Sequence, residues 1–381
     1  MSAVKRLPKV DLTHHWLVSM RGGEKVLEQF CLLFPESTIT MLVADKSRLE
    51  GAIRSAPVRT SFLQAIGGAR YYKKMLPLFP LAAGSLTVGC GASLVLSSDA
   101  SVIKGFRLAP GVPQVCYCHS PPRYLWDLQE TYERNTSEMN ALARLAFRAT
   151  VPFVRNFDRR AASSVTNFIA NSEFVRSRIR EFYGRDATVV HPPVDVAAFD
   201  PGLPRSDSYL VVSHLVPYKR IDIAVDAFNQ LGRPLTIIGE GSEFNALKSR
   251  AQPNIRFLGS RPFEELKRHY ETCRAFIFPG IEDFGITPLE AQAAGAPVIA
   301  FRAGGALETV VENKTGLFFD EQTPQALAGA VHDFERKAAM FDPARARENA
   351  VRFGPGRFRQ EIKAFLCREF PGLFMDYPWP V

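Results

Sequence analysis

Short apolar segments alternate with amphipathic stretches along the whole chain, and this alternation restricts the folds that the chain can adopt. Short segments that are apolar throughout are typical of strands buried on both faces of a parallel sheet, and the stretches between them have the periodicity of covering helices. In the first half the clearest strands are expected at residues 38–43, 94–97, 114–118 and 167–170. The sequence therefore predicts an α/β fold.

The second half repeats strand, turn and helix more regularly. Strands are expected at residues 209–212, 235–238, 255–258, 275–278 and 297–300. Such units are typical of Rossmann-type sheets, whose ligands bind outside the carboxyl ends of the strands. The loops that follow these strands are therefore expected to line one binding edge.

A proline-rich connector, residues 190–195, separates the two series. A chain of 381 residues is long enough for two domains, each with its own core. We predict two Rossmann-like, doubly wound domains that face each other across a cleft. The first comprises residues 1–195 and the second residues 196–355, and a C-terminal helix within residues 356–381 packs back on the first domain.

The formal net charge of +8 belongs to the first half of the chain. Residues 1–195 carry 25 Lys and Arg against 16 Asp and Glu, whereas residues 196–381 carry 22 against 23. A basic excess indicates an anionic partner, and nucleic acid, lipid head groups and nucleotide phosphates all qualify. Nucleic acid is disfavoured, because the sequence has no recognisable nucleic-acid-binding module and no run of more than two basic residues.

The N-terminus and the cysteines indicate a cytoplasmic protein. Basic Lys5 and Arg6 are followed by Pro8 without the apolar segment of a secretory signal. The six cysteines form no Cys-x-x-Cys pair, so reduced thiols are expected. Residues 75–98 are uncharged, but their prolines and glycines favour a loop, a short helix and a buried strand over a membrane span.

The strongest candidate site follows the strand at 275–278. Glu282 and Glu290 are separated by seven residues, the first in the strand-end loop and the second in the first turn of a helix expected at 288–294. Between them, Phe284-Gly285-Ile286-Thr287 offers backbone N–H groups at a helix N-terminus, which suits a phosphate. A glutamate that only stabilises its helix dipole would explain Glu290, but it would not explain both carboxylates.

A cationic loop ends another strand of the same predicted sheet and contains His214 and Lys219. A lysine at a strand end stabilises the charge of a departing diphosphate without a metal ion. A solvated surface lysine is the alternative interpretation.

In the first half, two segments carry polar groups. Gly22 and Gly23 permit a ligand to approach the backbone closely, although a plain turn accounts for them equally well. His119 and Arg123 follow the strand at 114–118, where an imidazole and a guanidinium are expected to face the proposed cleft.

Together these residues resemble the GT-B fold glycosyltransferases of family 4, and most closely the bacterial GDP-mannose-dependent mannosyltransferases of O-antigen and exopolysaccharide synthesis. The motifs that carry the resemblance span almost the whole chain: Gly22-Gly23-Glu24-Lys25-Val26, Tyr71-Tyr72-Lys73-Lys74-Met75-Leu76-Pro77, His119-Ser120-Pro121, Asn171-Ser172, Pro193-Val194-Asp195 and the second-half series through Gly304-Gly305.

The resemblance implies roles for these residues. Glu282 is implied to hold donor-sugar hydroxyls, Glu290 to bind the nucleotide ribose, and Lys219 to contact the diphosphate. The 284–287 backbone is implied to complete the phosphate cradle. His119 is implied to face the sugar, and Gly22-Gly23 to lie under the phosphates. The family usually has Arg where this chain has His214, which stabilises a diphosphate less when neutral.

The resemblance also implies a reaction: transfer of a mannosyl group from GDP-mannose to a lipid-linked (polyprenyl diphosphate) glycan, with retained anomeric configuration, in lipopolysaccharide or exopolysaccharide synthesis. The chain has no Asp-x-Asp metal motif, so we expect neither a metal nor another cofactor beyond the nucleotide-sugar co-substrate. A UDP-sugar such as UDP-glucose is the alternative donor. A non-catalytic nucleotide-sugar binding protein is the alternative of another class.

The basic first half is then expected to face lipid. Tyr71, Tyr72, Lys73 and Lys74 combine basic and aromatic side chains in a way that suits an anionic membrane interface. We predict peripheral association with the inner face of the cytoplasmic membrane, with these residues and Arg123 on the acceptor side. A solvated basic face is the alternative.

Overall fold

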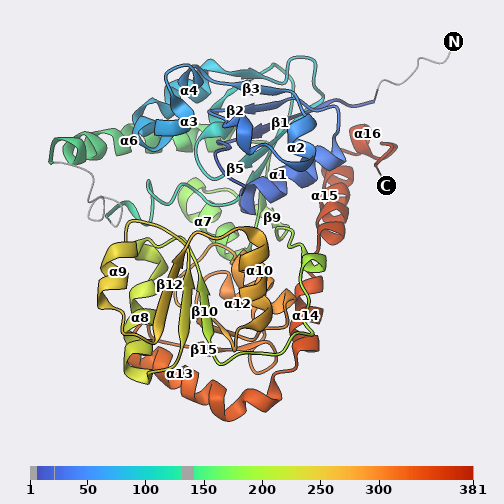
Figure 1. Ribbon diagram of the computed structural model, residues 1–381. Coiled ribbons are helices and arrows are strands. Elements are labelled where there is room, and N and C mark those ends of the chain that lie inside the picture. The colour runs from blue at the N-terminus through green and yellow to red at the C-terminus, as the bar shows by residue number, and fades with distance from the viewer. Residues whose placement is uncertain (1–6, 21, 131–140, 381) are drawn as a thin grey trace. The chain divides into compact units, whose positions relative to one another are not determined.

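The computed structural model describes residues 7–20, 22–130 and 141–380, and it divides into two compact units (Figure 1). The first unit holds the described residues up to 129, those from 141 to 193, and those from 355 onward. The second unit holds residues 194–354 and, of the residues described before them, Glu130. Each unit contains one large parallel sheet with helices on its faces, and the first unit also has a two-stranded parallel sheet of β4 (Thr87–Val88) and β6 (Arg107–Leu108). The large sheets confirm the predicted α/β class and the two Rossmann-like folds.

The first sheet has the strand order β3-β2-β1-β5-β7-β8-β9, and all its neighbouring strands are parallel. Its strands are β1 (Val10–His14), β2 (Ile39–Met41), β3 (Val58–Thr60), β5 (Leu94–Asp99), β7 (Gln114–Cys118), β8 (Asn167–Ala170) and β9 (Ala187–Val189). The order reverses between β1 and β5. The β1 strand is absent from our sequence-based expectations because its Asp, Thr and His interrupt the apolar run, yet all five of its residues are buried.

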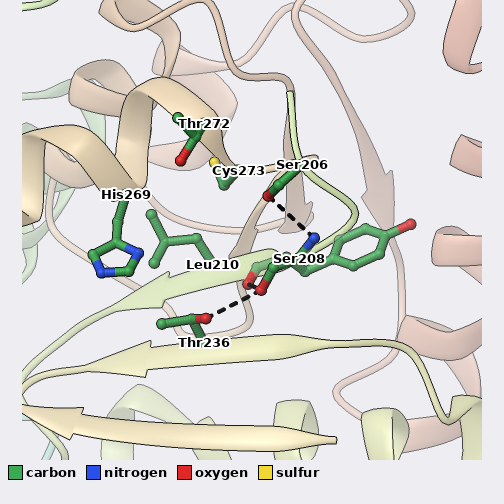
Figure 2. A pocket seen from close by; sticks show the side chains of 8 residues that line it. Ser206, Ser208, Leu210, Thr236, His269, Thr272 and Cys273 are labelled. Atoms are coloured by element: carbon green, nitrogen blue, oxygen red, sulfur yellow. Dashed lines mark hydrogen bonds between the residues drawn. The ribbon is translucent and has the colours of Figure 1, made fainter. Parts of the chain in front are cut away.

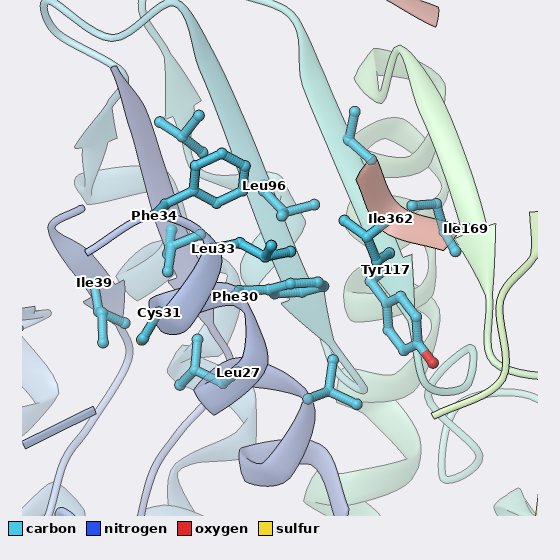
Figure 3. Packing of buried hydrophobic residues seen from close by; sticks show 14 of the residues in the cluster. Leu27, Phe30, Cys31, Leu33, Phe34, Ile39, Leu96, Tyr117, Ile169 and Ile362 are labelled. Carbon is cyan, nitrogen blue, oxygen red and sulfur yellow. The ribbon is translucent and has the colours of Figure 1, made fainter. Parts of the chain in front are cut away.

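The first unit takes its final helices from the C-terminal end of the chain. Helix α15 (Pro355–Glu369) packs on α1 (Gly22–Leu33), and Figure 3 shows Ile362 among core side chains from α1 and the strands. The ring of Phe30 lies 5.8 Å from the rings of both Phe358 and Tyr117. Each such fully buried aromatic side chain stabilises the fold by roughly 1.5–3 kcal/mol. The C-terminal segment is therefore an integral part of the first unit's core.

The second sheet has the strand order β12-β11-β10-β13-β14-β15, and it is also parallel throughout. Its strands are β10 (Tyr209–Val212), β11 (Leu235–Ile238), β12 (Ile255–Gly259), β13 (Phe276–Phe278), β14 (Val298–Phe301) and β15 (Gly316–Phe319). All five expected strands are confirmed, and β15 adds a sixth at the edge. Successive strands run outward in opposite directions from the β10–β13 pair, which makes that pair the switch point of the sheet.

The remaining helices complete the layers. In the first unit they are α2 (Gly51–Ser55), α3 (Gly68–Tyr71), α4 (Phe79–Ser85), α6 (Ala141–Ser164), α7 (Glu173–Tyr183) and α16 (Pro371–Phe374). In the second unit they are α8 (Ile221–Leu231), α9 (Phe244–Arg250), α10 (Phe263–Thr272), α11 (Ile286–Ala293), α12 (Ala306–Thr309), α13 (Pro324–Lys337) and α14 (Pro343–Val351). None of the helices in the described ranges has the length and apolar character needed to cross a bilayer.

Candidate active site

The carboxyl edge of the second sheet gathers the residues that the sequence analysis singled out in that unit. The loop after β10 carries Lys219 at the end of a short 3-10 helix, and the loop after β13 carries Glu282. Because β10 and β13 are neighbours at the switch point, the two loops meet although their residues are far apart in sequence. Crevices of this kind are the usual ligand sites of open parallel sheets.

Lys219 and Glu282 form an ion pair through Nζ and Oε1. The side chains are 15% and 21% exposed, so solvent reaches the pair but does not surround it. An ion pair that is partly exposed contributes little net stability, since desolvation offsets much of the attraction. The pair therefore keeps a cation and a carboxylate at the switch point. Separating the two side chains so that a ligand contacts either of them would cost little free energy.

Two glycines allow the loops around this pair to pack backbone against backbone. A Cβ at Gly280 would lie 2.7 Å from the carbonyl oxygen of Lys219, and a Cβ at Gly305 would lie 2.3 Å from Cα of Phe284. The amide of Gly305 also donates to the carbonyl of Glu282 over 2.9 Å. The loops after β10, β13 and β14 are thereby held together at distances that a side chain would prevent.

The segment between the two glutamates forms the start of α11, as expected, but the helix begins earlier than predicted. Gly285 caps it with φ of 92°, and Ile286 and Thr287 are its first residues. Glu290 therefore lies in the second turn and not in the first. The Phe284 side chain is buried in the core, 5.7 Å from the ring of Phe353, so only its backbone is available to a ligand.

Glu290 is held in place by a buried tyrosine. The hydroxyl of Tyr270 donates to Oε2 of Glu290 over 3.0 Å, and Tyr270 is fully buried. Burial, together with the Glu290 carboxylate, raises the pKa of Tyr270 well above its ordinary value. Tyr270 thus stays a hydrogen-bond donor and orients the carboxylate, a role that the sequence analysis missed because Tyr270 lies on a different helix, α10.

The cationic loop contains a backbone outlier next to Lys219. Arg220 adopts the left-handed conformation, with φ of 53°, at the start of α8. A non-glycine residue in this region costs about 1–2 kcal/mol. Its guanidinium pairs with Asp222 at 3.1 Å. The carbonyl of His214, at the other end of the loop, accepts from the amide of Val216 over 2.9 Å.

The carboxyl edge of the first sheet gathers three histidines around one serine. Ser98 Oγ lies 3.0 Å from Nδ1 of His14 and 2.8 Å from Nε2 of His119, while the Ser98 carbonyl lies 3.4 Å from Nδ1 of His15. The parallel pairing of β1 with β5 places His14 directly beside Ser98. The sequence analysis selected His119 but not Ser98, whose neighbours become apparent only once the strand order is known.

Gly22 and Gly23 lie beside this cluster, but they are the first residues of α1 and not a turn or loop before it. A Cβ at Gly23 would lie 3.6 Å from Nε2 of His119 and 3.6 Å from Cε1 of His14. Burial, with His14 next in importance, lowers the pKa of His15 to about 3. Burial followed by His15 and His14 also lowers the pKa of His119 to about 3. Both imidazoles are therefore neutral near pH 7.

A buried charge network supports the loop that carries His119. The amide of His119 donates to the carbonyl of Asp99 over 2.8 Å. The Asp99 carboxylate accepts from Nζ of Lys104 over 3.2 Å, and Lys104 also donates to Asp158 over 2.5 Å. Although burial opposes ionisation, Lys104 brings the pKa of Asp99 below its ordinary value. Removing one member of such a network leaves an uncompensated buried charge, which costs about 3–5 kcal/mol.

The residues expected on the acceptor side differ in how exposed they are and in what they contact. Tyr71 is exposed, with Arg70 over its ring, whereas Tyr72 packs 5.1 Å from the ring of Trp16 against the core. The Nε of Arg123 lies 3.5 Å from Asp127, so this guanidinium belongs to an internal ion pair. The side chains of Lys73 and Lys74 lie outside the described part of the structure. Of the two tyrosines, only Tyr71 offers its ring to a partner.

An exposed face on α6 extends this region, and the sequence analysis did not identify it. Leu145 is 65% exposed and Phe153 is 51% exposed, and both project from α6. The helix contacts α4, whose Leu81 is also exposed. Exposed apolar side chains therefore occur on three elements of the first unit: the segment around Tyr71, α4 and α6.

A small cavity in the second unit lies apart from these two edges. A cavity of about 20 Å³ lies where β10 begins, lined by Ser206, Ser208, Tyr209, Leu210, Thr236, His269, Thr272 and Cys273 (Figure 2). Such a volume has room for roughly one water molecule. It lies at the amino end of the strand and not at the carboxyl edge. The described residues form no cluster of three or more His, Cys, Asp and Glu side chains suited to a metal ion.

Models of two known protein families match two successive segments of the chain. Residues 200–352 match the model described as "Glycosyl transferases group 1", and residues 58–198 match the model described as "Glycosyltransferase Family 4". The chain belongs to the family 4 glycosyltransferases. This confirms the resemblance inferred from the motifs. The two matched segments contain all the site residues predicted from the sequence except Gly22 and Gly23.

Mannosyltransferases are among the curated relatives of this family 4 chain. A GDP-mannose-dependent alpha-(1-6)-phosphatidylinositol monomannoside mannosyltransferase of Mycolicibacterium smegmatis is 31% identical over 233 residues, which cover 53% of this chain and 60% of that protein. The human alpha-1,3/1,6-mannosyltransferase ALG2 is 26% identical over 318 residues, or 72% of this chain and 73% of that protein. The matched region thus spans about 60% of the mycobacterial relative.

Solved structures agree on the fold over nearly the whole chain. Anabaena Alr3699/HepE in complex with UDP and glucose has a TM-score of 0.66 at 18% identity, with 94% of this chain and 99% of that chain covered. Sucrose-phosphate synthase of Thermosynechococcus elongatus has a TM-score of 0.68 at 17% identity, with 96% and 100% covered. These likenesses confirm the GT-B fold.

Proposed function

We propose that the protein is a retaining mannosyltransferase that transfers a mannosyl group from GDP-mannose to a lipid-linked glycan on a polyprenyl diphosphate carrier, in the synthesis of a surface polysaccharide. The observation that carries the proposal is the Lys219–Glu282 pair at the switch point of the second sheet, with Glu290 on the helix that follows. The names of the curated relatives support GDP-mannose as the donor.

The ion pair provides the two groups that a nucleotide sugar needs. A diphosphate carries more negative charge than a single carboxylate, so it competes with Glu282 for Lys219. Once released, the Glu282 carboxylate is free to accept hydrogen bonds from sugar hydroxyls. The first amides of α11 favour an anion, and Glu290, oriented by Tyr270, is suited to the ribose hydroxyls.

The residues at this edge suit a substitution with retention. The acceptor hydroxyl forms a bond to the anomeric carbon while the bond from that carbon to the diphosphate oxygen breaks. The departing oxygen takes the hydroxyl proton, so the products are the glycoside and GDP. Lys219 and the amides of α11 stabilise the developing charge, which is why we propose no metal and no further cofactor. His214 contributes to the same loop, and His119 and Gly22-Gly23 are proposed as further donor contacts.

A donor screen with a polyprenyl diphosphate glycan tests this proposal, with release of GDP and UDP measured separately. We expect turnover of GDP-mannose, and a Glu282→Gln variant is expected to lose transfer while remaining folded. Glu321→Gln is the matched control, because Glu321 is an exposed glutamate of the same unit. Turnover of UDP-glucose alone would replace the donor assignment, and binding without turnover would identify a nucleotide-sugar binding protein.

We also propose that the first unit associates peripherally with the inner face of the cytoplasmic membrane. Residues 51–98 and 141–157 contain no Asp or Glu, and they supply exposed Tyr71, Leu81, Leu145 and Phe153 together with exposed arginines. Apolar side chains among cations suit an anionic bilayer surface. The same surface would bring the enzyme to a lipid-linked acceptor.

Flotation with vesicles of phosphatidylglycerol and phosphatidylethanolamine tests the membrane proposal. Replacing both Leu145 and Phe153 by Ser is expected to reduce binding about tenfold or more, since burying each large side chain is worth over 1 kcal/mol. Replacing Leu307 and Met340 by Ser is the control, because both are exposed to a similar degree in the second unit. Equal flotation of the two double variants would contradict the proposal.

A further inference from the structure

Ser98 connects two imidazoles through one hydroxyl. Its Oγ lies 3.0 Å from Nδ1 of His14 and 2.8 Å from Nε2 of His119. A serine hydroxyl has a single proton, so it donates to one imidazole nitrogen and accepts an N–H from the other. The position of the proton on His119 is therefore coupled to its position on His14. The residue on the other side of His14 determines which of the two imidazoles receives the Ser98 proton as a hydrogen bond.

That residue is Glu24. Its Oε1 lies 3.8 Å from Nε2 of His14, and the side chains of both residues are almost completely buried. Although burial alone would raise the pKa of Glu24, the neighbouring His14 side chain lowers it to about 2. Glu24 is thus a carboxylate near pH 7. At low effective dielectric a carboxylate attracts an N–H group and repels a nitrogen lone pair.

The position of each proton can be deduced one residue at a time, starting from the Glu24 carboxylate. His14 carries its proton on Nε2, toward Glu24, and its Nδ1 is left as an acceptor. The Ser98 hydroxyl donates to that Nδ1, and its oxygen accepts from Nε2–H of His119. We infer that Glu24, His14 and Ser98 form a relay that fixes the tautomer of His119, with the proton on Nε2 and the lone pair on Nδ1. Ser98, His14 and Glu24 are positioning residues in this arrangement.

The fixed tautomer determines what His119 is able to bind. An imidazole whose Nδ1 is unprotonated accepts a hydrogen bond, so its ligand at that atom is a hydroxyl or another donor and not a carbonyl or phosphate oxygen. Sugar hydroxyls have this chemistry. Only the choice of a sugar as ligand rests on the proposed function, since the tautomer itself follows from contacts within the first unit.

His15 supplies an internal reference. Its Nδ1 faces the carbonyl of Ser98 at 3.4 Å, and a carbonyl only accepts, so His15 carries its proton on Nδ1. The relay therefore predicts opposite tautomers for two neighbouring imidazoles whose ring centroids are 6.2 Å apart. Loss of the Ser98 hydroxyl removes the constraint on His119, but it leaves Glu24 beside His14 and the backbone contact of His15 in place.

Long-range nitrogen NMR of the full chain with ¹⁵N-labelled histidine tests the relay without any substrate. At mildly alkaline pH we expect Nε2–H at His14 and His119 and Nδ1–H at His15, with signals assigned by single replacement among the seven histidines. A proton on Nδ1 of His119 would overturn the inference. So would a doubly protonated His14, because it would donate from Nδ1 and reverse the relay.

Two variants separate the relay from general packing. In Ser98→Ala we expect His119 to become a mixture of both tautomers while His15 keeps Nδ1–H. Ser97→Ala is the control, because Ser97 is equally buried on the same strand and its hydroxyl accepts from Gln114 over 3.1 Å. An unchanged His119 in Ser98→Ala would refute the relay. If the tautomers match in a protein that transfers no sugar, the proposed function fails while the relay stands.

Discussion

The carboxyl edges of the two sheets present opposite kinds of polar chemistry. The first unit holds its imidazoles through a serine hydroxyl, and they are neutral at His15 and His119. The second unit holds a lysine and a glutamate in a partly exposed ion pair. Hydrogen bonds between buried neutral groups fix which atom donates and which atom accepts. A partly exposed ion pair instead exchanges partners with a charged ligand. In the proposed function, the first edge orients sugar hydroxyls and the second receives the diphosphate.

The largest effect is expected from removing the cation of the second edge. Lys219→Met removes the cation that is proposed to balance a departing diphosphate, and removing one such stabilising group typically lowers turnover by about 10²–10³-fold. The measurement is kcat/KM for GDP-mannose. Lys248→Met, on the exposed face of α9, is the control and is expected to keep the wild-type value. Equal values of kcat/KM in the two variants would show that Lys219, and hence the ion pair, does not contribute to catalysis.

Glycine substitutions test how each edge is built. A Cβ at Gly305 would clash with the backbone of Phe284, so Gly305→Ala is expected to lower the free energy of unfolding of the second unit by about 1–3 kcal/mol. The nearest atoms to a Cβ at Gly23 are at 3.6 Å, an ordinary contact. Gly23→Ala is therefore expected to fold normally and to lose activity only by filling the space beside the imidazoles.

Denaturant unfolding of both glycine variants, followed by separate probes in each unit, measures this difference. Gly329→Ala is the control, because Gly329 lies within α13 with no atom near the added methyl, and alanine there is expected to stabilise the helix by about 0.5–1 kcal/mol. Equal destabilisation by Gly305→Ala and Gly23→Ala would show that the two edges are packed alike.

Acidification tests the neutral character of the first edge. The folded state lowers the pKa of His15 to about 3 from an unfolded value near 6.5, so folding excludes the proton. The resulting stability is fully present above about pH 6.5 and is lost at about 1.4 kcal/mol per pH unit as the pH falls toward the folded pKa. Between pH 7 and pH 5 the free energy of unfolding is therefore expected to fall by about 2 kcal/mol less in His15→Gln than in the wild-type protein.

The free energy of unfolding measured against pH checks this expectation. His332→Gln is the control, because His332 is 55% exposed and its replacement is expected to leave the slope unchanged. A His15→Gln protein with the wild-type slope would show that His15 is protonated in the folded state, contrary to the neutral first edge.

The sequence predicts the strands well where they are apolar throughout and fails where buried residues are polar. The predicted bounds of β7, β8, β10 and β11 are confirmed. The β1 strand is missed because the hydrogen bond that makes buried His14 tolerable comes from Ser98, on another part of the chain. Local periodicity carries no information about such partners.

The same limit applies to the candidate site. Glu282, Glu290 and Lys219 are recognisable as strand-end residues, but the pairing of Lys219 with Glu282 depends on β10 lying next to β13. The exposed face of α6 was missed because helical periodicity does not show which residues a neighbouring element leaves uncovered. Residue types at strand ends are therefore predictable from sequence, and their partners require the sheet order.

The smallest effect is expected where the second edge relies on a neutral hydrogen bond, as the first edge does. Tyr270→Phe removes the hydroxyl that orients Glu290, and losing such a bond costs about 1 kcal/mol, or roughly fivefold in donor affinity. Tyr209→Phe loses a similar bond, 3.2 Å to Glu335, at the start of β10 and away from the switch point. The donor KM is expected to rise in the first variant alone, with kcat unchanged in both, because a ribose contact binds the ground state and the transition state alike. A fall in kcat for Tyr270→Phe would instead place Glu290 among the groups that stabilise the transition state. Tyr270 would then position Glu290 for the reaction, just as Ser98 is inferred to position His119 in the first edge.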